Sequence, residues 1–421
     1  MSVPGVHLPT QLDPEVVRAV AGRRDAISSW WTVGALLVVA AFLVLVAVRR
    51  RRRRHGGGGD GASEGDDGAP ATDGAATRRP TKRRRRAWPF VTAATLVTVV
   101  ALAVAANAFS GYVPNVAGLG LYVGFGGAGP RPGPTASVVP SPGATVATVA
   151  SPPPTGHGRL VETTIAAPAD LRVPTSTTYL YTPPGYDDSG RTLYPLVMLL
   201  HGAPGTSQAW FGNGIARTLD ALITSGQLRP VIVVTPDTNG TGTDDTGCLD
   251  STQGGSEVES YLEDVVVPWA DDHYPTSRDW RYGAVGGMSA GAYCALDQGL
   301  RHVDRYGTIL AIMPYDSPGS SGVDQLGADG DLAAHTPSRY LPTLDLPHPV
   351  AVFLADGDEE DVAEVRRART DLTAALRARG QTVVTRIVPG GHDWNTAAEA
   401  IPYGLVFWEQ QMRAADAAGA P

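Results

Sequence analysis

Short apolar runs alternate with segments of helical periodicity throughout residues 159–421, and no internal repeat is present. Apolar runs of four to eight residues are typical of buried strands, whereas longer amphipathic segments are typical of helices that cover a sheet. This alternation predicts an α/β fold, with a mostly parallel sheet and helices on both of its faces. The expected strands are 178–182, 194–200, 230–235, 307–313, 350–354 and 382–388, and the expected helices are 214–225, 258–273, 362–379 and 396–414.

The N-terminal region contains two long apolar stretches of a different kind. Residues 31–48 form 18 uninterrupted apolar positions, about 27 Å of helix, and residues 89–110 form a second stretch without a charge. Trp30 and Trp88 lie at the ends of these stretches, where amphipathic rings favour a membrane interface. We therefore expect two transmembrane helices. The alternatives are buried core helices and a signal sequence cleaved after Ala108.

Charge is distributed unevenly along the chain, although the formal net charge is only −8. Residues 49–88 hold 13 Lys and Arg, and a short loop so rich in cations is expected to stay in the cytoplasm. Its centre, 56–77, is rich in Gly, Asp and Ala and is expected to be disordered. Residues 159–421 carry 17 Lys and Arg against 34 Asp and Glu, which excludes nucleic acid as a partner.

These features predict a multi-pass protein of the cell membrane, with most of the chain outside the cytoplasm. Residues 1–30 form a short extracytoplasmic N-terminus, and residues 111–158, rich in Pro, Gly, Ser and Thr, form an extended, unfolded tether. Residues 159–421 are long enough for one large core and are expected to be an extracytoplasmic catalytic domain.

The sequence Gly287-Met288-Ser289-Ala290-Gly291 lies where an apolar strand-like run meets a helix-like one. A GxSxG motif in that context exposes the serine hydroxyl on a sharp strand-to-helix turn, as a nucleophile requires. Acyl transfer also needs two backbone N–H groups directed at the developing oxyanion. The candidates are Ala290, which follows the serine, and Ala203, because Pro204 has no N–H.

A histidine follows the last expected strand, in the sequence Pro389-Gly390-Gly391-His392. A histidine on a glycine-rich loop at a strand end is able to reach a serine and act as its general base. His335 and His348 also follow the serine, but they lie in irregular, Pro-rich sequence. The His201 side chain is expected to bind nearby backbone rather than to take part in catalysis.

The acid that orients this histidine is expected directly after the strand 350–354. Five acidic residues lie within 356–361, and most of them are expected to be solvated or to stabilise the next helix N-terminus. The first choice is Asp361, followed by Glu360 and then Asp358. The order serine, acid, histidine is that of the α/β-hydrolases.

The chain resembles the group of α/β-hydrolases that contains esterase D, feruloyl esterases and mycolyltransferases. The resemblance spans about residues 160–412 and implies an α/β-hydrolase fold, with Ser289 as nucleophile, His392 as base, and Ala203 and Ala290 as oxyanion donors. It places the acid at Glu360 or Asp361. The sequences that carry it are LYPLVMLLHGAPGTSQAW, PVIVVTPD, VESYLEDVVVPWADDHYPTSRDWRYGAVGGMSAGAYCAL and PGGHDW.

The only two cysteines, Cys248 and Cys294, both belong to the part expected outside the cytoplasm. An oxidising compartment permits a disulfide, and Cys294 lies shortly after Ser289 on the helix that follows it. A bridge would fix the Gly/Thr/Asp-rich loop 238–255 beside the nucleophile. Two buried free thiols are the alternative.

These predictions favour a serine esterase that acts on a carboxylic ester or an acyl-lipid, without a cofactor or a metal. An acyltransferase would use the same acyl-enzyme with a sugar or lipid hydroxyl in place of water. A membrane-tethered binding module with an inactive hydrolase fold and a serine peptidase are further alternatives. The sequence does not distinguish among acyl groups or acceptors.

Overall fold

The structure is a computed structural model, and it describes residues 11–22, 24–55, 88–123, 131–134, 136–240, 244–328 and 330–419. The chain forms two compact units. One consists of Met1–Asp25 together with Ser110–Pro421, and the other of Ala26–Phe109.

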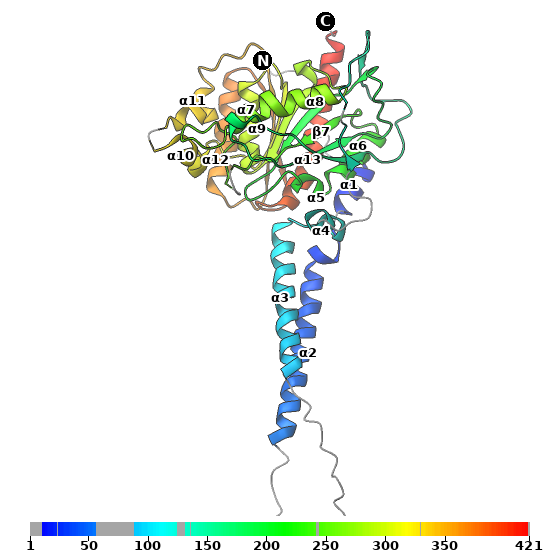
Figure 1. The fold of residues 1–421 in the computed structure, drawn as a ribbon, viewed down its shortest axis with the longest axis vertical. Coiled ribbons are helices and arrows are strands. Elements are labelled where there is room, and N and C mark those ends of the chain that lie inside the picture. Colours follow the sequence, from blue (N-terminus) through cyan, green and yellow to red (C-terminus); the bar gives the residue numbers. More distant parts are fainter. Residues whose placement is uncertain are drawn as a thin grey trace, which may run out of the picture. The chain divides into compact units, whose positions relative to one another are not determined.

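A nine-stranded sheet organises the larger unit (Figure 1). Its strand order is β1-β3-β4-β7-β6-β8-β9-β10-β11. The pairs β3–β4 and β4–β7 are antiparallel and the other pairs are parallel. The strands are β1 (Arg131–Pro132), β3 (Arg159–Thr164), β4 (Thr177–Thr182), β6 (Leu196–Leu200), β7 (Ile232–Thr235), β8 (Gly283–Met288), β9 (Thr308–Ile312), β10 (Ala351–Gly357) and β11 (Thr382–Val388); β2 (Thr145–Val146) pairs separately with β5 (Thr192–Leu193).

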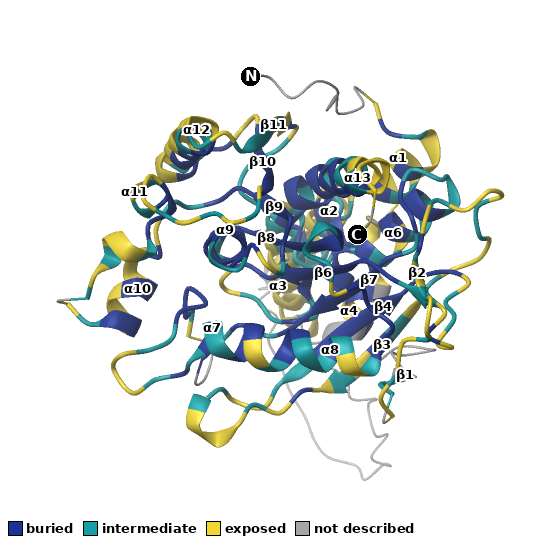
Figure 2. Ribbon diagram, turned by 90° about the horizontal axis from the view of Figure 1, so that it is seen from above, coloured by how far each residue is buried: buried dark blue, intermediate teal, exposed yellow. Residues whose placement is uncertain are grey.

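Helices cover both faces of this sheet because successive strand side chains point to opposite faces. On β6, Val197 and Leu199 join one hydrophobic cluster, with α6 and α13, whereas Met198 and Leu200 join the other, with α9 and α12. The central strands are therefore buried on both sides (Figure 2). The helices of this unit are α1 (Pro14–Ala21), α4 (Val116–Val123), α5 (Ala209–Gly212), α6 (Ile215–Thr224), α7 (Val258–Ser260), the π-helical turn η3 (Tyr261–Val266), α8 (Val267–His273), α9 (Ala290–Arg301), α10 (Gly319–Leu326), α11 (Pro337–Tyr340), α12 (Ala363–Ala378) and α13 (Trp394–Ala417), with short 3-10 turns at Ala169–Leu171, Trp280–Tyr282 and Leu332–His335.

The predicted fold is confirmed. Every expected strand and helix has a counterpart, and the sheet is mostly parallel with helices on both faces. The arrangement places the carboxyl ends of β8, β10 and β11 at one edge of the sheet, where α/β folds hold their ligand sites.

The smaller unit contains α2 (Trp30–His55) and α3 (Trp88–Ser110), with a 3-10 turn at Ala26–Ser28 before α2. The two helices are antiparallel, because Asn107 Nδ2 donates to Ile27 O and Arg50 lies over the ring of Phe90 at the other end. Both are long and apolar enough to cross a membrane, with mean hydropathies of 2.7 and 2.1, and both are mostly exposed. Helix α2 continues beyond the expected span of 31–48 and includes Arg49–Arg54. The rest of the expected basic loop, residues 56–87, lies outside the described residues.

The N-terminal segment packs on the sheet-containing part of the larger unit through α1. Val16 and Val20 are buried, and α1 packs against α6 and α13. The Asp13 N–H donates to Gln227 Oε1 (3.1 Å), and Arg217 donates to the carbonyl oxygen of Gly22 (3.1 Å). The chain segments on either side of the apolar hairpin therefore belong to one folded unit.

The segment 111–158, expected to be an unfolded tether, also packs on this domain where it is described. β1 extends the sheet beside β3, and β2 pairs with β5. Ala147 is buried, and its carbonyl oxygen accepts a hydrogen bond from Arg229 Nη1 (3.1 Å). A Pro- and Thr-rich composition favours extended backbone, and extended backbone is able to pair with an exposed strand. Composition alone does not distinguish a free extended chain from one that pairs in this way.

Candidate active site

Ser289 occupies the sharp turn between β8 and α9. Its backbone angles, φ 58° and ψ −122°, are strained for a residue with a Cβ, and such strain is concentrated at functional sites. The turn is held from outside, because the Ser289 N–H donates to Ile312 O (3.0 Å). A Cβ at Gly291 would lie 2.4 Å from the carbonyl oxygens of Leu200 and His201, so this position of the motif requires glycine. The expected strand–serine–helix geometry is present.

His392 reaches the serine from the loop between β11 and α13. Its Nε2 lies 2.8 Å from Ser289 Oγ. The loop is fixed by its neighbours: Asp358 Oδ1 accepts from Gly390 N–H (2.9 Å), and the Glu359 N–H donates to Gly390 O (2.8 Å). The sequence offered Asp358 as a possible orienting acid, but the structure shows it holding the histidine loop.

Glu360 lies on the opposite side of the imidazole from Ser289. Its Oε2 is 2.8 Å from His392 Nδ1, and its Oε1 accepts from the Val362 N–H (2.9 Å). The side chain is buried, which alone would raise the pKa of the carboxyl group. The hydrogen bonds from His392 and Val362 outweigh burial and lower the pKa of Glu360 below its ordinary value. Glu360 is therefore ionised and accepts from Nδ1–H, which leaves Nε2 free to accept the serine proton.

Asp361, the first choice from the sequence, is not the residue that contacts His392. Asp361 is exposed, whereas Glu360 is 6% exposed and turned inward. The cause is a turn after β10 in which the Glu360 N–H donates to Gly357 O, which places residue 360 beneath the histidine loop. The carboxylate in contact with His392 is thus that of the second choice, Glu360.

A third carboxylate, Asp356, lies at the end of β10, close to the acid. It is paired with Arg369 Nε on α12 at 2.5 Å. Burial raises the pKa of Asp356 to about 6, although the neighbouring arginine acts in the opposite direction. Glu360 and His392 are both near enough to influence this pKa. The Asp356 carboxylate, when ionised, therefore adds a second negative charge beside the Glu360–His392 pair.

One expected oxyanion donor directly follows Ser289, and the other belongs to a loop that lies against it. Ala290 is the first residue of α9, and the N–H groups of a first helical turn have no partner within the helix. The loop 201–205 lies against the serine, because a Cβ built on Gly202 would be 3.2 Å from Ser289 Cβ. Ala203 is exposed in this loop. The structure thus brings both alanines to the region of the nucleophile.

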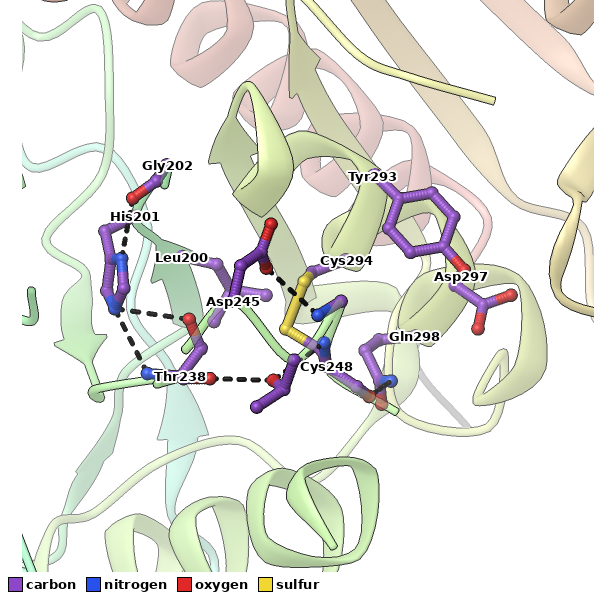
Figure 3. Close-up of a disulfide and its surroundings, with 12 residues drawn as sticks. Leu200, His201, Gly202, Thr238, Asp245, Cys248, Tyr293, Cys294, Asp297 and Gln298 are labelled. Atoms are coloured by element: carbon purple, nitrogen blue, oxygen red, sulfur yellow. Dashed lines mark hydrogen bonds between the residues drawn. A yellow bond between two sulfur atoms is a disulfide. The ribbon is translucent and has the colours of Figure 1, made fainter. Parts of the chain in front are cut away.

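The side chain of His201 binds backbone, as expected. Its Nε2 accepts from the Thr238 N–H (3.1 Å), and its Nδ1 lies 3.0 Å from Gly202 O (Figure 3). The imidazole is buried and fixes the start of the His-Gly loop to the loop that follows β7. Of the other histidines that follow the serine in sequence, His335 has its Nδ1 3.6 Å from Asp297 Oδ2, and His348 stacks on the ring of Trp280.

A disulfide joins Cys248 to Cys294, with Cα atoms 5.5 Å apart (Figure 3). Cys294 lies on α9, directly after the nucleophile turn, and Cys248 lies in the expected loop after β7. Gln298, one turn further along α9, donates to Cys248 O (3.3 Å). The loop that contacts His201 is therefore attached covalently to the helix that begins at the nucleophile.

Tyr315 belongs to the site but was not predicted from the sequence. Its ring centroid lies 5.9 Å from that of His392. Burial and the charge of Glu360 raise the pKa of Tyr315, whereas a hydrogen bond with Ser289 acts to lower it. The available signal was its position, three residues after β9, at the same edge of the sheet as Ser289.

Comparison with known proteins places this geometry in a family. The family model described as "Putative esterase" matches residues 175–408. An uncharacterised protein of Corynebacterium glutamicum is 31% identical over 159 residues, 36% of this chain and 37% of its own length. An esterase of Mycobacterium tuberculosis is 30% identical over 168 residues, 39% of this chain and 33% of its own. The matches thus span about a third of the length of these curated relatives.

Solved structures support the same fold at lower identity. A ferulic acid esterase is 23% identical with a TM-score of 0.53, and the match covers 61% of this chain and 99% of that one. An S-formylglutathione hydrolase from Agrobacterium tumefaciens is 17% identical with a TM-score of 0.50, and the match covers 61% and 96%. These likenesses confirm the predicted α/β-hydrolase fold.

Proposed function

Because the chain belongs to the esterase family, we propose that it is a membrane-tethered serine hydrolase that cleaves carboxylic esters outside the cytoplasm. The observation that carries this proposal is the uninterrupted hydrogen-bonded series Ser289 Oγ–His392 Nε2 and His392 Nδ1–Glu360 Oε2, with both distances 2.8 Å. A nucleophile, a base and an orienting acid in this order are the arrangement that activates a serine for acyl transfer.

The first half of the reaction forms an acyl-enzyme. His392 Nε2 accepts the Ser289 hydroxyl proton as Oγ attacks the ester carbonyl carbon, and the carbonyl π electrons move to the oxygen. The amides of Ala203 and Ala290 stabilise this oxyanion. When the tetrahedral intermediate collapses, the ester C–O bond breaks and the imidazolium returns its proton to the departing alcohol. Glu360 stabilises the imidazolium while it holds two protons.

Water completes the cycle by the same groups. His392 accepts a proton from water as the water oxygen attacks the acyl carbon. The second tetrahedral intermediate then expels Ser289 Oγ, which recovers the proton from His392, and the carboxylic acid leaves. No metal or cofactor takes part in any of these steps.

The extracytoplasmic placement rests on the apolar hairpin and on the charges that it brackets. The 13 Lys and Arg within residues 49–88 favour the cytoplasm for that loop. The start of α2 at Trp30 and the end of α3 at Ser110 then face the extracytoplasmic side. The packing of α1 on α6 supports this topology, because the segments before α2 and after α3 fold together.

The nucleophile is tested by Ser289→Ala in the full chain. This change removes one hydroxyl and creates almost no cavity, so hydrolysis of a small activated ester should be lost while the folded structure persists. The measurements are p-nitrophenyl butyrate turnover and thermal unfolding. Residual activity within tenfold of the parent would refute the role of Ser289. Activity appearing only with an added sugar or lipid alcohol would instead identify an acyltransferase, and equal inactivity of parent and variant would favour a binding module.

A further inference from the structure

Tyr112, directly after α3, contacts the loop 201–205 and the first residue of α13, which follows the His392 loop. The Tyr112 hydroxyl donates to the carbonyl oxygen of Pro204 (2.7 Å), in the loop that provides Ala203. Its ring packs edge-on against Trp394, two residues beyond His392, with centroids 6.5 Å apart. Asn213 Nδ2 donates to Tyr112 O (3.3 Å), which fixes the backbone at the same point. Tyr112 therefore joins the loop of the proposed oxyanion donor to the helix that follows the base.

Chain length limits how far this contact lies from the end of the apolar hairpin. Tyr112 follows Ser110, the last residue of α3, by two positions. Two residues of fully extended chain span at most about 7 Å. If α3 crosses the membrane, as proposed above, Tyr112 and its contact with the active-site loop 201–205 lie close to the extracytoplasmic end of the helix, at Ser110.

The chain segment that enters α2 is attached at the same place. The Asp25 N–H donates to Pro114 O (2.9 Å), and Asp25 Oδ2 accepts from the Val116 N–H (2.8 Å). Asp25 is the residue before the 3-10 turn that leads into α2. The residues that precede and follow the hairpin are therefore joined to each other within the larger unit, a few residues from Tyr112.

The segment Ser110–Val123, called the juxtamembrane segment below, has a composition suited to a lipid interface. It contains no charged residue, in contrast to the excess of 17 acidic over basic residues in 159–421. Helix α4 packs against α5, with Gly118 against the Gly212 carbonyl. On α4, Val116 and Leu119 remain 59% and 39% exposed. Exposed apolar side chains on a short uncharged helix next to a membrane span favour insertion into the interface.

From these contacts we infer that the juxtamembrane segment holds the Ser289 site against the outer membrane surface, and that the substrates are ester-linked lipids resident in that leaflet. The inference rests on the proposed function and specifies its substrate class. A lipid in the leaflet needs to rise only a short distance to place its ester carbonyl on Ser289, so it avoids transfer of its acyl chain through water, which costs about 0.8 kcal/mol per CH₂. The bond broken and the fate of the protons are those described above.

The first experiment lifts the site from the membrane without altering it. Twenty-residue Gly/Ser segments are inserted between Asp25 and Ala26 and between Ser110 and Gly111, which adds a mean reach of about 25 Å at each attachment. The full chain is assayed in phospholipid nanodiscs with two esters of one fluorophore, 4-methylumbelliferyl butyrate in solution and 4-methylumbelliferyl palmitate in the bilayer. We expect the palmitate-to-butyrate ratio of turnover to fall at least tenfold. The matched control has both insertions within residues 56–87 and should keep the parental ratio.

The outcomes separate this inference from the proposed function. A parent that hydrolyses butyrate, but whose ratio is the same in both insertion variants, would overturn the inference and leave the esterase intact. A parent that hydrolyses neither ester would overturn the proposed function itself, and the inference with it.

A second experiment changes the surface rather than the distance. Val116→Asp combined with Leu119→Asp introduces two charges on α4 where lipid contact is inferred, and the palmitate-to-butyrate ratio should fall about tenfold. The control is Val139→Asp, at a residue that is 81% exposed. The neighbouring Val138 N–H donates to Asp272 O, near the end of α8. The chain runs from α8 into the amino end of β8, whereas Ser289 follows the carboxyl end of β8. Val139 is therefore expected at the edge of the sheet opposite to Ser289. A similar ratio in both variants would contradict the inferred surface.

Discussion

Glu360 and Glu263 are both buried carboxylates of the catalytic domain, but their surroundings move their pKa values in opposite directions. Glu360 accepts hydrogen bonds at both oxygens, from His392 and Val362, and its pKa is lowered. Glu263, in the turn η3, accepts one from the Tyr306 hydroxyl (2.9 Å) at Oε1. Its Oε2 has no hydrogen-bond partner among the described residues, and burial raises its pKa to about 7.

The difference reflects both the deeper burial of Glu263 and the hydrogen-bond donors that only Glu360 has at both of its oxygens. Arg305 Nε lies 3.6 Å from Glu263 Oε2, close enough to act through charge but too far for a hydrogen bond. Glu360 is held ionised, as a residue that stabilises an imidazolium must be. Glu263, with a pKa of about 7, keeps its proton in about half of the molecules at neutral pH. Variants at the two positions should therefore fail in different ways.

The largest effect is expected from Glu360→Gln, which keeps the shape but removes the negative charge. The amide oxygen of the glutamine accepts from the Val362 N–H, so its NH₂ group faces His392 Nδ1, the wrong tautomer is favoured, and kcat should fall by about 10⁴. Asp361→Asn, at the neighbouring exposed acid, is the matched control and should stay within about threefold of the parent. The measurement is steady-state turnover of p-nitrophenyl butyrate, with unfolding temperatures recorded for both variants. Loss of activity in Asp361→Asn with retention in Glu360→Gln would restore the assignment favoured by the sequence.

The sequence predicted the positions of Ser289 and His392 because local patterns define them. Each follows a strand that is recognisable as an apolar run, and each has glycines that permit a sharp loop. The acid was not decided, because five carboxylates occupy six positions and their spacing does not distinguish them. The choice depends on a local backbone turn from Gly357 to Glu360 and on the hydrogen bond of Asp358 with Gly390, which joins two separate chain segments.

The N-terminal third of the chain shows where composition is insufficient. Hydropathy located both apolar helices, since a long apolar run is a property of the local sequence. The pairing of β1 with β3 and the contact of Tyr112 with Pro204, 92 residues further along the chain, depend on surfaces that are distant in sequence. A single sequence contains no signal for such pairings.

A smaller effect, on stability rather than on rate, is expected from Glu263→Gln. The pKa of Glu263 is about 7 in the folded chain and about 4.5, its ordinary value, in the unfolded chain. At pH values between these two pKa values, the folded chain keeps a proton that the unfolded chain has lost. The free energy of unfolding of the parent therefore falls as pH rises from 4.5 to 7, by about 3 kcal/mol in total. The glutamine cannot ionise, so its advantage over the parent should appear above pH 5 and be complete by pH 8. Unfolding temperatures of the full chain at pH 5 and pH 8 provide the measurement, and Asp264→Asn, at an adjacent exposed carboxyl, is the control. A parent and a Glu263→Gln variant that lose stability in parallel would show that Glu263 is ionised despite its burial.

The smallest effect is expected at Asp356, whose surroundings are intermediate between those of the other two acids. Burial raises its pKa to about 6, but Arg369 opposes this shift, so the carboxylate is ionised at pH 8 and largely protonated at pH 5. When ionised, it adds a negative charge near His392 and should stabilise the imidazolium in the transition state. Asp356→Asn should therefore lower kcat about threefold at pH 8, the size of a screened interaction that does not involve direct contact. At pH 5 the parent has lost the same charge, so the two rates should converge, and the ratio of parent to variant kcat should titrate with a midpoint near 6.

The control is Asp361→Asn, measured across the same pH range, for which the ratio of parent to variant kcat should not change with pH. A constant deficit in Asp356→Asn at every pH would mean that the residue acts only by holding Arg369 and α12 in place.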